Sequence, residues 1–96
     1  MREVVKRPLA YADLEGIWLY TFGQWGEEQA DRYLRQLDEQ ITALASTPER
    51  GKSAEMIRAG YYSIHAGRHL VFYTFTDTIV SVRRVLHDQM DVGRHL

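Results

Sequence analysis

The chain has 96 residues, enough for one domain around a single hydrophobic core, and 12 basic and 13 acidic side chains give it a formal net charge of −1. This balance excludes a general electrostatic attraction to nucleic acid, so any contact with a polyanion has to be local. The chain has no cysteine, which excludes disulfide bonds and thiol catalysis and fits a reducing compartment. No apolar run reaches the length of a signal peptide or a membrane span. We therefore expect one cytoplasmic domain, residues 1–96, with no membrane contact.

The N-terminal half predicts one strand and two helices. Glu3–Lys6 is short and β-branched, and the proline that follows predicts the end of a strand. From Ala10 the apolar residues follow a helical period, and Gly23 is the predicted C-terminal cap of this first helix, which has about three turns. A second helix begins near Gly26 and ends before Thr47. Because few residues separate the two helices, they should form an antiparallel hairpin.

The C-terminal half predicts three strands and a tail. Tyr61–His65, His69–Phe75 and Ile79–Leu86 alternate with a period of two and are joined by connections short enough for antiparallel hairpins. Met56-Ile57 either extends the first of these strands or forms a short piece of its own. The predicted fold class is α+β: an N-terminal strand, an antiparallel helical hairpin that covers one face of a three-stranded antiparallel meander, and a short C-terminal tail.

The tripeptide Gly51-Lys52-Ser53 matches the end of a phosphate-binding loop. That motif also needs a glycine five positions earlier, where this chain has Ser46, and it needs a strand before the loop and a helix after it. Here a helix precedes and strands follow. We therefore do not expect nucleotide binding at this loop.

The four histidines raise the question of a metal site. His65 and His69 flank a predicted turn, and His87 and His95 lie eight residues apart in the tail, but these spacings match no known zinc or iron pattern. No Gly-x-Ser-x-Gly motif is present, and no serine has a neighbour that marks it as a nucleophile. The sequence thus predicts no metal, no cofactor and no catalytic residue.

Two adjacent arginines in the last predicted strand need an explanation. If Val82 and Leu86 face the core, strand alternation places Arg84 on the same face and Arg83 on the other. A guanidinium on an apolar stripe needs an acceptor, since an unpaired charge there costs several kcal/mol.

Two interpretations of Arg84 remain open. In the first, it forms a structural ion pair with Asp88, Asp91 or a carboxylate of a helix. In the second, it is a positive group held at the sheet edge for a phosphate or for a carboxylate of a partner.

Several stretches of the chain are similar to one known family. They are Tyr11–Tyr20, Trp25–Ala30, His69–Tyr73, and the end of the chain with Arg84–His87, Met90-Asp91 and Arg94–Leu96. Together with the order of the predicted elements, they resemble the ParE branch of the RelE/ParE superfamily of bacterial toxin–antitoxin toxins.

The resemblance implies a type II toxin that inhibits DNA gyrase and is neutralised by a ParD-like antitoxin in a hetero-oligomer. Contact with operator DNA would be indirect, through the antitoxin, and no catalytic residues are implied. ParE-type chains often have arginine after Phe-Tyr, where this one has Thr74, so a charge at the centre of the sheet is missing.

Two alternatives remain. A RelE-like, ribosome-dependent mRNA endonuclease would need a base, an acid and cations around the scissile phosphate, and this chain offers only two lysines and a thin cluster of Arg58, Arg68, Arg84 and His87. An inert toxin retained for autoregulation is the other.

The tail is predicted to be a docking element. Leu86, Met90 and Leu96 are expected to pack it against the sheet and to leave Arg94 and His95 for a partner, because interfaces favour arginine and methionine over lysine. The candidate residues for binding a target or partner are Arg83, Arg84, His87, Met90, Asp91, Arg94, His95 and Leu96.

Overall fold

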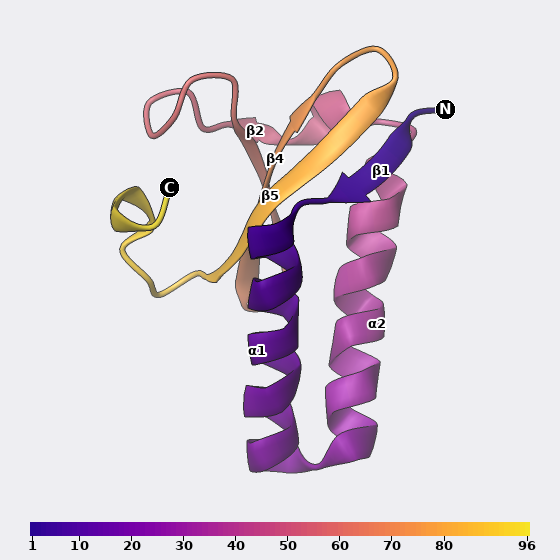
Figure 1. Cartoon of the computed structure of the whole chain (residues 1–96), viewed down its shortest axis with the longest axis vertical. Helices are drawn as coiled ribbons and strands as arrows, with labels where there is room; N and C mark the ends of the chain where they lie inside the picture. Colours follow the sequence, from indigo (N-terminus) through magenta and orange to yellow (C-terminus); the bar gives the residue numbers. More distant parts are fainter.

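The computed structural model describes residues 1–96 as a mixed five-stranded sheet with two long helices packed on one face (Figure 1). The predicted α+β fold is confirmed. None of its helices is both long and apolar enough to cross a membrane. In chain order the elements are β1 Glu3–Lys6, α1 Pro8–Trp25, α2 Glu27–Ala43, the 3₁₀ turn η1 Pro48–Arg50, β2 Lys52–Ser53, β3 Tyr62–Ala66, β4 His69–Phe75, β5 Ile79–His87 and the 3₁₀ turn η2 Val92–Arg94.

The strand order is β1-β5-β4-β3-β2, so the first and last strands of the chain are neighbours. The predicted meander β3–β4–β5 is antiparallel, and β1 pairs with β5 in parallel. The two-residue strand β2, at the other edge, was not predicted. Strand β1 pairs only with Ile79–Val82 of β5. On this edge, the rest of β5 runs beside α1 and has no strand as its neighbour (Figure 1).

The helical hairpin is tighter than predicted. Helix α1 begins at Pro8, a residue suited to the first helical position, and continues through Gly23 to Trp25, so the predicted cap at Gly23 is wrong. The cap is Gly26, whose φ of 91° favours glycine and whose N–H donates to the carbonyl oxygen of Phe22. The same residue precedes α2, so a single residue joins the two helices.

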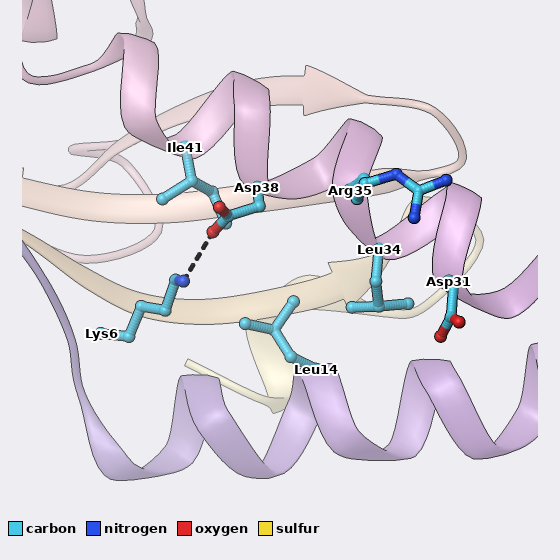
Figure 2. Close-up of a pocket in the computed structure, with 7 residues that line it drawn as sticks. All are labelled: Lys6, Leu14, Asp31, Leu34, Arg35, Asp38 and Ile41. Atoms are coloured by element: carbon cyan, nitrogen blue, oxygen red, sulfur yellow. Dashed lines mark hydrogen bonds and ion pairs between the residues drawn. The ribbon is translucent and has the colours of Figure 1, made fainter.

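An apolar contact between the helices and an ion pair between β1 and α2 lie on one side of the hairpin (Figure 2). The side chains of Leu14 and Leu34 point toward one another between α1 and α2. Lys6 Nζ lies 2.6 Å from Asp38 Oδ1, which links the end of β1 to α2. The lower half of the hairpin extends beyond the sheet (Figure 1).

The main core lies between the helices and the sheet. Tyr73 is its largest fully buried side chain, and its hydroxyl donates to the carbonyl oxygen of Pro48 at 2.6 Å. The cluster comprises Ala10, Leu37, Ile41, Leu44, Ile64, Ala66, Val71, Tyr73, Val80, Val82 and Val85.

A second, smaller cluster lies on the opposite face of the sheet. Phe72, Leu86 and Ala54 form its buried centre, and Val92 and Leu96 of the tail pack against it. The tail therefore covers the sheet face that the helices leave open.

A β-bulge in β5 separates two residues that were predicted to share a face. Phe72 of β4 lies opposite Arg84, but the next residue, Tyr73, lies opposite Val82, which leaves Arg83 without a partner. Beyond this extra residue the alternation is inverted, so Val82 packs against the helices and Leu86 packs on the tail side. Arg83 and Arg84 consequently point to the same face, the tail side, which corrects the prediction that they diverge.

We expect Gly51→Ala to destabilise the protein by about 1–3 kcal/mol, because the added methyl would lie 2.0 Å from the hydroxyl of Tyr73, which is buried and held by Pro48. The backbone of Gly51 is extended and accepts alanine, so the effect isolates the clash. Urea unfolding measures it. Gly16→Ala is the control: it meets open space in the middle of α1 and should leave stability unchanged or raise it by about 1 kcal/mol. Equal unfolding free energies for Gly51→Ala and the unsubstituted protein would contradict this packing.

Candidate functional site

An ion pair between α1 and β5 lies at the base of the tail. Arg84 Nε is 2.8 Å from Asp13 Oδ2 and its Nη2 is 2.9 Å from Oδ1, so the pair is bidentate. Only 19% of the Arg84 side chain and 15% of the Asp13 side chain are exposed. The hydrogen bonds that Arg84 donates to Asp13 raise the pKa of Arg84 against the opposing effect of burial, so the guanidinium stays charged.

Asp13 also satisfies the unpaired part of β5. Beyond Val82 this strand has no partner on the β1 side, and Asp13 Oδ2 accepts the N–H of Val85 at 2.9 Å. The carboxylate thus replaces a missing strand at this point. The interpretation of Arg84 as part of a structural ion pair is confirmed, and the partner is a helix carboxylate. Asp13 was not predicted as a site residue; the available signal was that Asp13 and Glu15 are the only two acids in a largely apolar helix.

The predicted tail acids have other roles. Asp88 lies 3.0 Å from His65 Nε2 and 3.5 Å from His87 Nδ1, so it does not pair with Arg84. Asp91 precedes the turn η2 and is exposed.

The same guanidinium fixes the end of the tail. Arg84 Nη1 donates to the carbonyl oxygen of His95 at 2.8 Å. Arg58 Nη1 donates to the main-chain oxygen of Leu96 at 3.3 Å. Leu86 and Leu96 pack as predicted, but Met90 is 40% exposed, and Val92 takes its place against the sheet because η2 turns that residue inward.

His69 and His87 form a cluster with Tyr33 at the end of β5, where the tail begins. Tyr33 Oη accepts the N–H of Arg68 and donates to Nδ1 of His69 at 2.6 Å, and the rings of His69 and His87 meet edge to face with centroids 5.2 Å apart. Burial, and then the charge of His87, lowers the pKa of His69 to about 4, so His69 is neutral near pH 7. No group of three histidine, aspartate or glutamate side chains is placed to hold a metal ion.

A large groove runs between α1 and the second half of β5. It has a volume of about 710 Å³, and its walls are mostly apolar. We call it the α1 groove and define it by Ile17, Tyr20, Trp25, Tyr33, Leu86 and Met90. Tyr20 and Trp25 are 70% and 73% exposed, and no other part of the chain covers them.

A second hollow, of about 360 Å³, lies on the tail side of the sheet. Arg83, Arg84, His95 and Leu96 line it together with Arg58. Arg84, His87 and Met90 line the α1 groove, and Asp91 and Arg94 are exposed outside both. The structure thus divides the candidate residues between two surfaces. The thin cluster considered for RNA cleavage is divided as well: Arg68 and His87 line only the α1 groove and Arg58 only the other hollow.

Comparison with known proteins identifies the family. Residues 4–92 match the profile of a family described as the ParE toxin of the type II toxin-antitoxin system parDE. The chain belongs to the ParE toxin family. It is 44% identical over 90 residues to Toxin ParE1 of Mycobacterium tuberculosis, covering 93% of this chain and 92% of that one. It is 42% identical over 87 residues to Toxin ParE1 of Caulobacter vibrioides, covering 91% and 90%.

Solved structures share the fold of this ParE-family chain. A chain of the chromosomal ParDE toxin–antitoxin system from P. aeruginosa superposes with a TM-score of 0.80 at 17% identity, covering 91% of this chain and 96% of that one. A chain of the toxin–antitoxin complex RelBE2 from Mycobacterium tuberculosis gives a TM-score of 0.70 at 26% identity, covering 90% and 96%. The predicted RelE/ParE-like membership is confirmed. The family profile ends at Val92, before the last four residues of the tail.

Proposed function

We propose that this ParE-family toxin inhibits DNA gyrase as a protein ligand, without catalysis of its own, and that a ParD-like antitoxin neutralises it. The observation that carries the proposal is the match to the ParE toxin family over residues 4–92. The toxin would act in the cytoplasm, and its contact with operator DNA would be through the antitoxin.

The α1 groove is the proposed site of the antitoxin. Its apolar walls and its uncovered aromatic residues fit the apolar face of a helix or an extended segment. Both superposed structures come from toxin–antitoxin systems, which supports a partner of this kind. Of the charged side chains in the lining, Asp13 and Arg84 pair with each other and only Arg68 remains, so the contact would be mainly apolar.

The tail is the proposed contact with gyrase. Arg94 and His95 are exposed, and the turn that carries them is fixed to the sheet by Arg84 and by the packing of Leu96. A fixed turn loses little conformational entropy on binding, which favours it as a docking element. Of the candidate residues, Arg94 and His95 would contact the target directly, and Arg84 would position them.

The geometry favours a protein ligand over an RNA-cleaving enzyme. Cleavage needs several cations and a proton donor and acceptor around one phosphate. The residues considered for cleavage do not converge: Arg84 is neutralised by Asp13, and Arg68 and His87 lie in a different hollow from Arg58.

A gyrase supercoiling and DNA-cleavage assay with purified toxin tests the proposal. We expect inhibition that accumulates cleaved DNA and that the cognate antitoxin reverses. Growth arrest on expression without the antitoxin would contradict the alternative of an inert toxin. Absence of any effect on gyrase, in the presence of growth arrest, would contradict the proposed target.

Deletion of Gly93–Leu96 should abolish gyrase inhibition and toxicity while antitoxin binding is retained, because the α1 groove is intact and only the docking turn is lost. Circular dichroism and antitoxin pull-down serve as controls for folding. A truncated toxin that still arrests growth would rule out the tail as the contact.

Tyr20→Glu should leave gyrase inhibition intact but weaken antitoxin binding by roughly tenfold or more, because it places a charge in the apolar groove. Isothermal titration calorimetry with the antitoxin measures the change. Leu19→Glu is the matched control: Leu19 is 56% exposed on the same helix but outside the groove, so its affinity should not change. Equal losses in both variants would argue against this groove.

A further inference from the structure

The hollow on the tail side of the sheet gathers arginine side chains and is lined by no acidic side chain. Nine residues line it, and four of them are arginines while none is acidic. We call it the arginine hollow and define it by Arg7, Arg58, Tyr61, Arg83, Arg84 and His95. The whole chain has a net charge of −1, so the positive side chains of this hollow are a local concentration of charge.

Three of these arginines lack any carboxylate partner. Arg84 is neutralised by Asp13, but Arg7, Arg58 and Arg83 take part in none of the five ion pairs of the structure. The nearest acid in the adjoining loop, Glu55, accepts the main-chain N–H of Gly60 and does not line the hollow.

Hydrogen bonds hold the three guanidiniums in place, and that of Arg58 donates to the main-chain oxygen of Leu96 at 3.3 Å. Arg7 Nη2 donates to Ser81 Oγ at 3.1 Å, and Arg83 Nε donates to Thr74 Oγ1 at 3.2 Å. The second bond leaves both terminal nitrogens of Arg83 without a protein partner. Guanidiniums held in this way are positioned for an anion and still carry their full charge.

The start of α1 adds to the same field. Pro8 and Leu9, the first residues of the helix, line the hollow next to Arg7. This helix end has no side-chain cap and no acid in its first turn, so its free N–H groups and its dipole remain available to an anion. The start of α1 and the arginines come from different segments of the chain, and all of them line the arginine hollow.

An aromatic ring beside the arginines favours a nucleic acid over an acidic peptide. Tyr61 lines the hollow, and the guanidinium carbon of Arg58 lies 5.5 Å from its ring centroid. Arginines on a backbone track next to an aromatic platform are typical of sites that bind single strands, where the cations contact phosphates and the ring stacks on a base.

We propose that the arginine hollow binds a backbone phosphate of a nucleic-acid strand, with Arg7, Arg58 and Arg83 as its cationic ligands and Tyr61 as a stacking platform for the adjoining base. This site shares only Arg84 with the α1 groove. It requires neither gyrase nor an antitoxin, so it can hold or fail independently of the proposed function.

Fluorescence anisotropy of the full chain with a labelled single-stranded oligonucleotide tests the site, in parallel arms with DNA and RNA of the same sequence. We expect the variant R7Q/R58Q/R83Q to bind at least about tenfold more weakly at low salt and to lose most of the salt dependence, which for one neutralised phosphate of a single strand has a log–log slope of about −0.7. Binding in either arm supports the site, and the stronger arm identifies the strand.

Two further variants make the result specific. R32Q/R35Q/R50Q removes the same charge from exposed arginines outside the hollow and should bind as the unsubstituted protein does. R7K/R58K/R83K keeps the charge and should recover most of the affinity, which excludes simple misfolding.

Three results would overturn the inference: no binding in either arm, equal weakening in R7Q/R58Q/R83Q and R32Q/R35Q/R50Q, or tighter binding of an oligo-glutamate peptide than of both oligonucleotides. A toxin that inhibits gyrase but binds no oligonucleotide would contradict this site alone. One that binds the oligonucleotide and has no effect on gyrase would contradict the proposed function alone.

Discussion

The ion pair between Asp13 and Arg84 joins three parts of the molecule that are far apart in sequence. Asp13 belongs to α1, Arg84 to β5, and the remaining guanidinium nitrogen binds the carbonyl oxygen of His95 in the tail. Because both side chains are mostly buried, loss of either partner leaves a charge without its counter-charge, which is more costly than loss of a surface pair. The same carboxylate completes the hydrogen bonding of β5 where β1 ends.

Two candidate binding surfaces lie beside this ion pair. On one side lies the α1 groove, apolar and aromatic, and on the other lies the arginine hollow, with the tail across its edge. Arg84 lines both surfaces and lies at the boundary between them. Its charge is neutralised by Asp13. A partner in the groove and a ligand in the hollow would therefore contact different side chains of one small domain.

The sequence predicted the elements well because each has a local signal. The alternation of Tyr61–Phe75 and the period of α2 are visible without tertiary context, and the ParE-like stretches gave the order of elements and the family. The two strands that pair over long sequence separations were harder: nothing local shows that β1 pairs with β5 or that Lys52-Ser53 joins the edge.

The site was less predictable, because one extra residue changed it. The β-bulge at Arg83 inverts the alternation of β5, so a rule that is correct for regular strands placed the two arginines on opposite faces. The arginine hollow also combines Arg7, Arg58 and Arg83 from three separate segments, and only the fold brings them together. Gly23 shows the same limit at a helix end, since the conformation with positive φ occurs three residues later, at Gly26.

A double-mutant cycle on the free energy of unfolding tests the central claim that Asp13 and Arg84 act as one unit, with the variants Asp13→Asn, Arg84→Gln and the combination. We expect each single substitution to cost about 3–5 kcal/mol and the combination to cost clearly less than the sum, with a coupling energy above about 1 kcal/mol. Additive losses, equal to within about 0.5 kcal/mol, would contradict the claim that this pair holds helix, strand and tail together.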